Sequence, residues 1–567
     1  MQDKIQVGIH STGYCSSASV FLNETPVFAA QEERLSRIKF DNSFPMKSIY
    51  KGLKAIGADI DDVQEFLFSW NPVINAASRY RAGFSKWVPN PMQRLYSGLN
   101  HILPALAEDC GNVDTSEQIV RYFGKKEIKF NYVNHHFAHI GMSVYTSPFE
   151  DTAVMIADGY GELKTTVFAH KTADGNIKIL KTADFPHSLG MFYAAFTEFL
   201  GFEPEKDEWK LMGAAAYGDP DTYADKVRSM IQTDMNGNFS LVLEYFNFYN
   251  FETQNTYTAK FSELLGEPFS GTELTQREYD LAAAVQLVFE ETVFGLLNWL
   301  HKQTGTRNLC LGGGAFMNCL ANGKIAEYTP FSEVFVPFAP DDSGNAIGSV
   351  LYMNKKQLPY MSPYTGNSHT ENEIEDTLKK FKLTYRISDE NGINDFTVSC
   401  LMENRIVSWF SGRMEFGQRA LGNRSIFASP LKAETKDIIN SAVKYRESFR
   451  PFAPAIMHEK GGEWFENYVY TPYMERILKF KSQKTDYVPA VVHNDGTGRL
   501  QSVRKQDNER FYNLISAFER RTGVPVILNT SLNKAGEPIV ATAEDAIKTF
   551  FTSGIDVMIL DKFILEK

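Results

Sequence analysis

Two stretches of the chain repeat one pattern of apolar and polar positions. The apolar runs of the first stretch are 5–9, 18–22 and 26–30. Those of the second stretch are 152–157, 165–170 and 177–181. Short apolar runs separated by turns such as Asp174-Gly175 predict strands joined in hairpins. We therefore predict two β-meanders, each with a polar loop after its first strand, at 11–17 and at 158–162.

A long helix is predicted after the second meander. Apolar residues keep helical spacing from 275 to about 301, and Thr275 with Glu278 forms a capping box. A short strand at 308–311 then leads into the glycine turn 312–314. Glycines between a strand and a helix let a phosphate approach backbone N–H groups, although close packing requires such glycines about as often.

The character of the sequence changes between residues 365 and 385. Prolines, a glycine and then an amphipathic helix interrupt the alternation of strands and helices there. The remainder again alternates apolar strands with helical segments. We therefore predict an α/β protein with one domain at 1–370 and a second at 385–567.

Composition narrows the class of protein. The 567 residues are 43% hydrophobic and 22% charged, as is usual for a globular enzyme, and the net charge is -11. An acidic balance disfavours a general polyanion-binding surface but allows a local basic pocket. No apolar run is long enough to predict a membrane span, and the N-terminus lacks a signal core. With five scattered cysteines, we expect a cytoplasmic protein without a membrane partner.

Two histidines and an aspartate form a candidate metal site. His135 and His139 are four residues apart, so they share one face of a helix, and Asp158 ends the apolar run 153–157. Two imidazoles and a carboxylate suit Fe(II), Mn(II) or Zn(II). Asp342, at the end of a later strand, can add a second carboxylate. The alternative is a helix with surface histidines, a turn aspartate and an aspartate N-cap.

Basic residues gather in one part of this acidic chain. Between 413 and 450 there are eight Lys or Arg against four Asp or Glu, and the basic residues lie largely within the motifs 412–425 and 444–454. Arginines beside glycines and aromatic residues suit the capture of phosphate or carboxylate, and the aromatic content argues against a plain solvated face. Polar loops at 493–499 and 528–533 follow apolar runs, as loops that line a ligand do.

Ten motifs together identify a family. They are 32–37, 135–139, 158–159, 210–213, 312–318, 342–348, 412–425, 444–454, 495–499 and 529–533. In this order they resemble the NodU/TobZ family of ATP-dependent O-carbamoyltransferases over nearly the whole chain. The N-terminal part resembles the duplicated, actin-like (ASKHA) ATPase-type subunit of tRNA threonylcarbamoylation enzymes. The C-terminal part resembles a YrdC-like α/β domain.

The resemblance implies a reaction with two sites. In the YrdC-like domain, carbamoyl phosphate gives carbamate, and ATP, with Mg²⁺, converts the carbamate to carbamoyl adenylate and pyrophosphate. In the actin-like domain, a hydroxyl of the acceptor attacks the adenylate, an O-carbamate forms and AMP leaves. The resemblance also implies an iron, Fe(II) or another divalent metal, held by residues matching His135, His139, Asp158 and Asp342.

The resemblance assigns further residues to the two sites. Those of the YrdC-like site are Arg419, Lys444, Arg450, Arg499 and Ser531. Nucleotide or co-substrate contacts are expected from Lys210, Gly312, Gly313, Gly314, Asn318, Arg446, Asn529 and Ser531. Carbamoyl phosphate, ATP and pyrophosphate are polyanions, so a cluster of fixed cations agrees with this chemistry.

The first meander loop departs from the family pattern. Family members commonly carry His-Asp-Ala-Ser there, but Tyr14 and Cys15 stand in the places of the histidine and the aspartate. A tyrosine with an ordinary pKa near ~10 is a poor base at neutral pH. Either Tyr14 is activated by the metal or a neighbouring cation, or the acceptor is more acidic, or another residue serves, or transfer is lost. We predict that this loop still contacts the acceptor.

The acceptor is predicted to be a small molecule with a hydroxyl group, such as a natural product, a sugar or a hydroxymethylated nucleobase. Its specificity is expected to come from 75–130 and from 235–270. The basic and aromatic residues of 79–96 could contact a substrate, or that segment is a lid or packing segment with a solvated face. One alternative is the same machinery acting on an amine or a threonylcarbamoyl-type acceptor. Another is a nucleotide-binding protein that has lost transfer. The net charge does not favour a nucleic-acid acceptor, and a homo-oligomer is compatible with the sequence.

Overall fold

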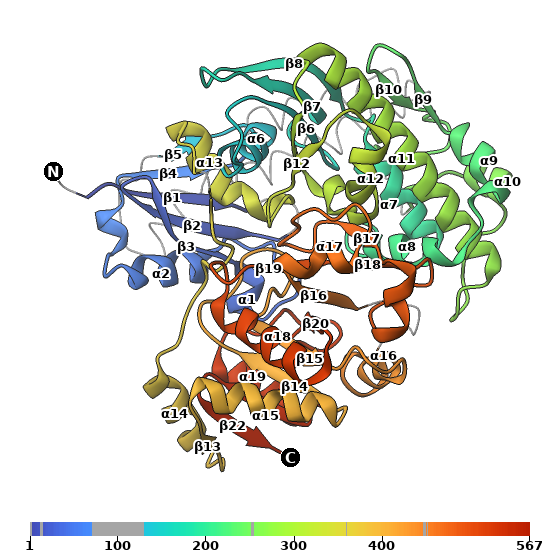
Figure 1. The fold of residues 1–567 in the computed structure, drawn as a ribbon. Coiled ribbons are helices and arrows are strands. Elements are labelled where there is room, and N and C mark those ends of the chain that lie inside the picture. Colours follow the sequence, from blue (N-terminus) through green and yellow to red (C-terminus); the bar gives the residue numbers. More distant parts are fainter. Residues whose placement is uncertain are drawn as a thin grey trace. The chain divides into compact units, whose positions relative to one another are not determined.

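The computed structural model describes residues 3–11, 15–70, 130–250, 255–358, 360–445, 450 and 452–567 (Figure 1). The chain divides into two compact units. Unit 1 comprises Met1–Val27 and Ile56–Met361, and unit 2 comprises Phe28–Ala55 and Ser362–Lys567. Unit 2 thus includes an early segment of the chain that the sequence analysis assigned to the first domain.

Unit 1 contains two five-stranded sheets of the same design. Its strands are β1 (Ile5–His10), β2 (Ser17–Leu22), β3 (Thr25–Gln31, which runs on into unit 2), β4 (Glu65–Phe68), β5 (Phe130–Tyr132), β6 (Thr152–Ala157), β7 (Lys164–Lys171), β8 (Ile177–Asp184), β9 (Ile231–Thr233), β10 (Phe239–Leu241), β11 (Asn308–Gly312) and β12 (Glu333–Phe335). The sheet orders are β3-β2-β1-β4-β5 and β8-β7-β6-β11-β12, with a small β10-β9 pair besides. In the first sheet, β1 is antiparallel to β2 and parallel to β4. In the second sheet, β6 is likewise antiparallel to β7 and parallel to β11. The two predicted meanders are therefore confirmed, and they begin two copies of one strand order.

Two helices pack between the two sheets of unit 1. Helix α13 (Asn345–Asn354) packs on β1, β2 and β4, helix α6 (His135–Tyr145) packs on β6, β7 and β11, and the two helices pack against each other. Glycines make this close crossing feasible. A Cβ on Gly141 would lie 2.1 Å from the carbonyl oxygen of Gly348, and a Cβ on Gly348 would lie 2.0 Å from that of Ala138. The crossing brings the start of α13 close to the N-terminal turn of α6.

Further helices complete unit 1. They are α7 (Leu189–Phe199), α8 (Glu208–Ala214), α9 (Ala224–Arg228), α10 (Ala259–Leu265), α11 (Gln276–Thr304) and α12 (Cys319–Tyr328). Helix α11 confirms the long helix that the periodicity predicts. Its capping box is formed as expected, since Glu278 accepts hydrogen bonds from the backbone N–H and the hydroxyl of Thr275. The helix ends at Gly305, whose φ of 69° is the left-handed conformation typical of a C-cap.

Unit 2 is an α/β layer structure. Its strands are β13 (Arg386–Ile387), β14 (Val407–Phe410), β15 (Arg424–Ala428), β16 (Ala453–Met457), β17 (Ile477–Lys479), β18 (Thr497–Arg499), β19 (Gln501–Val503), β20 (Val526–Ser531), β21 (Val557–Leu560) and β22 (Phe563–Glu566). Its helices are α1 (Glu32–Ser36), α2 (Met46–Ala55), α14 (Glu371–Lys380), α15 (Glu390–Met402), α16 (Glu434–Ile439), α17 (Gly461–Trp464), α18 (Glu509–Thr522) and α19 (Ala543–Phe551). An eight-stranded sheet in the order β13-β22-β21-β14-β15-β20-β16-β19 carries the core, and β17 pairs with β18. Helices α15, α18 and α19 pack on this sheet.

Two arginines attach the early segment to the rest of unit 2. The side chain of Arg34 is 1% exposed, and its Nη2 donates to the carbonyl oxygen of Gly417 over 2.6 Å. Arg37 donates to the carbonyl oxygens of Ile539 at 2.7 Å and Pro538 at 2.8 Å. Two arginines of the motif 32–37 therefore hold unit 2 together through backbone carbonyls that lie far along the chain.

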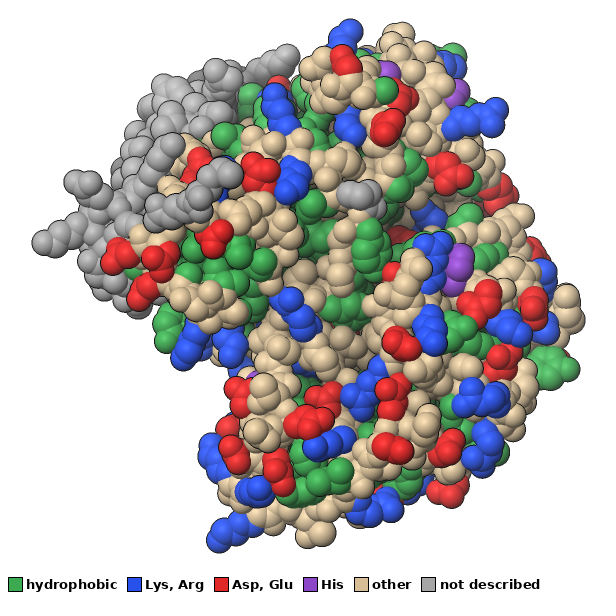
Figure 2. All heavy atoms as spheres, turned by 60° about the vertical axis from the view of Figure 1, so that its left-hand side comes forward, with side chains coloured by type: hydrophobic (Ala, Val, Ile, Leu, Met, Phe, Trp, Pro, Cys, Tyr) green, Lys and Arg blue, Asp and Glu red, His purple; other side chains and the backbone are tan. Residues whose placement is uncertain are grey.

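One face of the molecule carries charged side chains of both signs (Figure 2). Figure 2 shows lysines and arginines interspersed with aspartates and glutamates over the face it draws, together with scattered hydrophobic side chains. Within the part of the chain that the structure describes, no helix is both long enough and apolar enough to cross a membrane.

Candidate functional site

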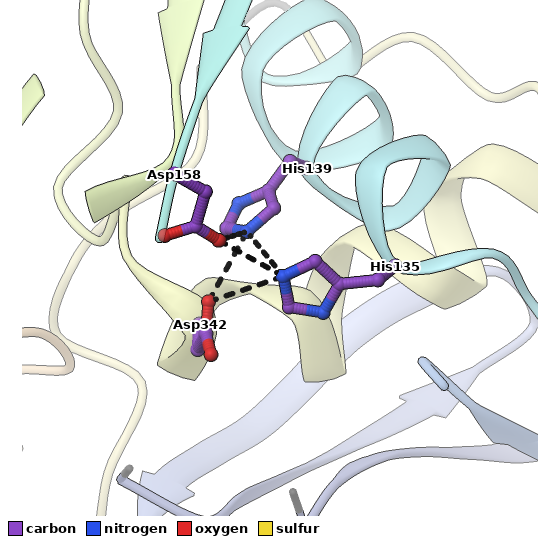
Figure 3. A group of neighbouring side chains, drawn as sticks. All are labelled: His135, His139, Asp158 and Asp342. Carbon is purple, nitrogen blue, oxygen red and sulfur yellow. Dashed lines mark hydrogen bonds and ion pairs between the residues drawn. The ribbon is translucent and has the colours of Figure 1, made fainter. Parts of the chain in front are cut away.

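Four side chains converge between the two sheets of unit 1. His135 and His139 lie one turn apart on α6, Asp158 follows the last residue of β6, and Asp342 begins the 3-10 turn η5 (Asp342–Gly344) that leads into α13. One ligand atom from each residue lies within 4.8 Å of the others. Figure 3 shows the two rings and the two carboxylates pointing toward one another from these elements. The structure thus brings together all four residues predicted to bind a metal.

The spacing of these atoms suits a single ion. Oδ2 of Asp158 lies 2.9 Å from Nε2 of His135 and 3.1 Å from Nε2 of His139. Oδ1 of Asp342 lies 3.3 Å and 3.2 Å from the same two nitrogens, which are 3.2 Å apart. With metal–ligand bonds of about 2.0–2.2 Å, neighbouring ligands in octahedral or tetrahedral geometry are about 2.8–3.6 Å apart. The cluster therefore has the donor set and the spacing for one divalent cation.

Backbone groups orient the first carboxylate and the helix. Oδ1 of Asp158 accepts hydrogen bonds from the N–H of Gly159 at 2.8 Å and of Gly314 at 3.3 Å, which leaves Oδ2 to face the rings. The carboxylate of Glu162 accepts the N–H of His135 at 3.1 Å and the side-chain amide of Asn134 at 2.8 Å. Glu162 thus satisfies the N-terminus of α6, where a negative charge is favourable. These contacts have the character of the outer shell of a metal site.

Asn345 provides a further test of the fit. Its side-chain amide lies 3.4 Å from Nδ1 of His135, and its Oδ1 is buried with no hydrogen-bond partner in the described part of the chain. A histidine that binds a metal through Nε2 carries its proton on Nδ1 and needs an acceptor there. Turning the Asn345 amide by 180° supplies that acceptor and satisfies Oδ1. The residues present therefore fit a metal.

The charges of the cluster also balance. Burial alone would lower the pKa of His135, but the carboxylates of Asp342 and Asp158 raise it well above its usual value. Burial likewise would lower the pKa of His139, and hydrogen bonds to the same two carboxylates raise it. Burial would raise the pKa of Asp158, yet the two imidazoles hold it well below the usual range. The cluster thus favours two positive charges beside its two carboxylates, and one divalent ion supplies the same charge.

The structure adds a histidine that the sequence analysis missed. His10 is the last residue of β1 and is fully buried. Its Nδ1 lies 2.9 Å from Oγ of Ser69, and its Nε2 lies 3.6 Å from Oδ2 of Asp342. The sequence does carry a signal, because His10 is a polar residue at the end of a strand and borders the loop predicted to contact the acceptor. The family pattern places a loop histidine at the position of Tyr14, so it does not point to His10.

The glycine turn after β11 serves packing. Gly313 has a φ of 90°, and a Cβ there would lie 2.1 Å from the carbonyl oxygen of Ala157. A Cβ on Gly312 would lie 2.3 Å from Oγ of Ser143. Close packing therefore accounts for both glycines, whether or not they also bind a ligand. Gly314 donates its N–H to Asp158 of the candidate metal site, as described above. Their predicted contact with a nucleotide stays a prediction.

Two other predicted nucleotide contacts already have protein partners. Asn318 caps α12 through the N–H of Ala321 and exchanges hydrogen bonds of 2.9 Å and 3.0 Å with Gln286. Nζ of Lys210 lies 2.8 Å from a carboxylate oxygen of Asp207. Tyr14, Arg446, most of 75–130 and part of 235–270 lie outside the described residues, so the predictions made on them stay predictions.

In unit 2, Lys444 is joined to the end of β20. The lysine ends a short π-helix (Asn440–Lys444) and is 4% exposed. Its Nζ donates to Oγ of Ser531 at 3.2 Å and to the carbonyl oxygen and Oδ1 of Asn533, both at 2.9 Å. The structure thus brings the predicted pair Lys444 and Ser531 together and adds Asn533, which the sequence analysis named only as part of a motif.

The loop that carries Arg419 is held by a buried carboxylate. Oε1 of Glu415 accepts the backbone N–H groups of Leu421, Asn423 and Arg424 at 2.9, 2.7 and 3.1 Å. Glu415 is 1% exposed, so these charge-assisted bonds form away from water. The amide of Asn529 contributes from β20, donating to the carbonyl oxygen of Ala420 at 3.1 Å and to Gln501 at 2.7 Å. The described contacts of Asn529 therefore position the loop.

The arginines of this region differ in role. Arg424 is fully buried, donates to the carbonyl oxygens of Ser411 and Gly412 at 2.8 and 3.0 Å, and lies over the ring of Phe410, so it supports the loop. Its burial lowers its pKa to about 10. Arg499 ends β18 opposite Ile477.

Arg499 acts on the charge of His493, and the backbone of Arg450 is bonded to Asn440. Burial, with the charge of Arg499, lowers the pKa of His493 to about 4. The backbone carbonyl of Arg450 accepts from Asn440 at 3.4 Å.

Comparison with known proteins gives a consistent result along the chain. The family model described as the carbamoyltransferase N-terminus matches residues 5–351, and the model described as the carbamoyltransferase C-terminus matches residues 398–567. An uncharacterized protein of Synechocystis sp. is 33% identical over 99% of this chain and 96% of the relative. The nodulation protein NolNO of Sinorhizobium fredii is 32% identical over 97% of this chain and 78% of its own. A 3'-hydroxymethylcephem-O-carbamoyltransferase of Amycolatopsis lactamdurans is 28% identical over 78% and 81%.

Proposed function

This chain belongs to the carbamoyltransferase family and is a transferase enzyme, and we propose that it makes an O-carbamate from carbamoyl phosphate, ATP and a hydroxyl compound. The observation that carries the proposal is the cluster of two imidazoles and two carboxylates within the region matched by the N-terminal family model. Such a cluster suits a site that binds an anionic activated intermediate through a metal.

The first step is assigned to unit 2. Carbamoyl phosphate and water give carbamate and phosphate, and carbamate then attacks the α-phosphorus of ATP, which gives carbamoyl adenylate and releases pyrophosphate. Each species is an anion, so the step needs cations that are held in place. Lys444 is fixed by Ser531 and Asn533, and the loop of Arg419 is fixed by Glu415. We assign phosphate binding to these two cations together with Arg450, Arg499 and Arg446.

The second step is assigned to unit 1. The oxygen of the acceptor hydroxyl attacks the carbamoyl carbon, the bond from that carbon to the phosphate oxygen breaks, AMP leaves and the hydroxyl proton passes to a base or to water. A divalent metal such as Fe(II), when held by His135, His139, Asp158 and Asp342, would supply positive charge that orients and neutralises the phosphate of the adenylate. The chain itself contributes the orientation of these ligands through Gly159, Gly314 and Glu162 described above.

We also assign the two units to known architectures. Unit 1 is proposed to have the actin-like fold, which is supported by its two sheets of identical strand order with α6 and α13 between them. Unit 2 is proposed to be YrdC-like, which is supported by the buried Lys444 beside Ser531 in the region matched by the C-terminal family model.

The proposed acceptor is a small molecule with a hydroxyl group. A relative named for a hydroxymethylcephem acceptor supports a small-molecule acceptor, and the mixed charge of the face in Figure 2 does not favour nucleic acid. The rival proposal is a nucleotide-binding protein that has lost transfer activity. It is favoured by Tyr14 and Cys15, which stand where family members commonly carry histidine and aspartate.

One assay separates these functions. Purified protein is incubated with ATP, Mg²⁺ and carbamoyl phosphate, without an acceptor, and pyrophosphate release is measured. The proposal predicts release that depends on carbamoyl phosphate and is lost in Lys444→Met. The matched control is Lys432→Met, an exposed lysine of the same unit, which is expected to behave as wild type. Absence of release from a folded wild-type protein would refute the first step.

A second assay addresses transfer. Candidate hydroxyl compounds are added to the same mixture, and products are screened for the mass increase of one carbamoyl group. The amine-directed alternative would be favoured by pyrophosphate release and AMP formation without a carbamoylated product from any hydroxyl class, if amines did give a product.

A further inference from the structure

We propose that His10, held by Ser69, is a positioning residue that orients Asp342 as a ligand of the metal centre. The inference rests on the proposed function, because it presupposes that the cluster of unit 1 binds a metal. It concerns residues of the first sheet, whereas three of the four cluster ligands come from α6 and from the end of β6 in the second half of the unit.

Ser69 on one side and the carboxylate of Asp342 on the other together select the tautomer of His10. Both side chains are fully buried, and Oγ of Ser69 lies 2.9 Å from Nδ1 of the ring. If Nδ1 carried the proton, Nε2 would present a lone pair to the carboxylate of Asp342, 3.6 Å away, and two acceptors would face each other. The negative charge therefore favours the other tautomer, in which Ser69 donates to Nδ1 and the N–H at Nε2 points to Oδ2 of Asp342.

The two ligand carboxylates are then held in the same way, with one oxygen toward the histidines of the cluster and the other toward an N–H group. In Asp158, one oxygen faces the histidines, and the other accepts the backbone N–H groups of Gly159 and Gly314. In Asp342, Oδ1 faces the same histidines, and Oδ2 faces His10. Asp342 is the more exposed of the two, with a side chain 24% accessible against 12% for Asp158. A partner that limits its rotation is therefore more consequential for Asp342.

The separation of His10 and Asp342 is set by the backbone. A Cβ on Gly8, two residues before His10, would lie 1.8 Å from the carbonyl oxygen of Ala346, so β1 and α13 are in direct contact. Oγ of Ser17 on β2 donates to the carbonyl oxygen of Ser343 over 2.7 Å, one residue beyond Asp342. These contacts hold η5 against the first sheet, so His10 meets the carboxylate without rearrangement of the chain.

An outer-shell partner of this kind is expected to alter affinity without providing a metal bond. Loss of such a partner typically weakens metal binding about 10- to 100-fold. The variants are His10→Leu, which removes the N–H, His10→Gln, whose amide places an N–H at a similar reach, and Ser69→Ala, which removes only the hydroxyl. His170→Gln, a surface histidine that pairs with Asp151, is the control.

The test is a titration of the metal-free full-length protein with Co²⁺, followed by the visible absorption spectrum and the dissociation constant. His10→Leu is expected to bind about 10- to 100-fold more weakly with an altered spectrum. Ser69→Ala is expected to shift both readouts in the same direction, and His10→Gln is expected to restore most of the affinity and the wild-type spectrum. The control is expected to match wild type.

Three outcomes would overturn the inference. Wild-type affinity and spectrum in His10→Leu would do so directly. If that variant does not fold, as judged by circular dichroism, unchanged binding by Ser69→Ala decides against it. Equal loss in His10→Leu and His10→Gln would mean that the ring acts by its shape rather than by its N–H. A wild-type protein that binds no metal would instead refute the metal site of the proposed function, which these variants do not address.

Discussion

Replacing Asp158 by asparagine tests the metal centre most directly. The side chain has two distinct ends in the structure. One oxygen accepts two backbone N–H groups, and the other lies 2.9 and 3.1 Å from the two imidazole nitrogens. In Asp158→Asn, the amide oxygen must stay with the backbone donors, because an amide nitrogen there would meet N–H groups. The NH₂ group then faces the histidines and cannot bind a cation.

The size of the effect follows from this geometry. Loss of an outer-shell partner costs about 10- to 100-fold in affinity, so loss of a direct carboxylate ligand should cost at least about 100-fold. That factor is about 2.8 kcal/mol, at about 1.4 kcal/mol per tenfold change. A metal at about 100 times the wild-type Kd stabilises wild type by about 2.7 kcal/mol, and the same concentration stabilises a variant bound 100-fold more weakly by only about 0.4 kcal/mol.

The assay combines binding with stability. Metal-free wild type and Asp158→Asn are titrated with Mn²⁺ or Co²⁺, and thermal unfolding is followed at each concentration. Bound metal is counted in parallel by elemental analysis. Asp151→Asn is the matched control, since Asp151 is a more exposed aspartate of the same unit that pairs with His170. It is expected to keep the wild-type stoichiometry and the wild-type thermal shift.

The reasoning fails if Asp158→Asn folds and binds the metal as tightly as wild type with unchanged stoichiometry. It also fails if Asp151→Asn loses the metal to the same extent, because the effect would then reflect general charge rather than a ligand. A variant that unfolds is recognised by circular dichroism, and His139→Gln then provides the same test from α6.

Three further predictions concern folding and the second site. Gly348→Ala should destabilise the protein by about 1–3 kcal/mol, measured by denaturant unfolding, because the added Cβ would meet the carbonyl oxygen of Ala138. In contrast, a Cβ on Gly295 in α11 would have no atom within 4 Å, so Gly295→Ala should stabilise the protein by up to about 1 kcal/mol. Glu415→Gln should reduce pyrophosphate release without unfolding the chain, since three backbone donors lose a charged acceptor, and wild-type release would contradict the role given to that loop. Burial raises the pKa of Glu208 from 4.5 to about 7. The contribution of this group to stability is therefore present below pH 4.5 and is lost as the pH rises through about 7. Glu208→Gln should flatten the pH dependence of unfolding in that window, and an unchanged profile would refute the assignment.

Local patterns in the sequence determined the elements and the ligands that single elements present. The spacing of His135 and His139 places both on one face of α6, and the strand that ends before Asp158 presents its carboxylate. Thr275 and Glu278 predict the start of α11. Each of these features depends on contacts within a few residues, where helical and strand periodicity is sufficient to specify geometry.

Tertiary structure decided which distant elements meet. The segment with Arg34 joins unit 2 because its side chain reaches a carbonyl far along the chain, and no local pattern encodes that partner. The same holds for the division of labour among the arginines, in which buried Arg424 supports the loop of Arg419. His10 meets Asp342 only because α13 lies on β1. Such pairings come from burial summed over many residues, so the polar groups at each junction are set by the packing of whole elements.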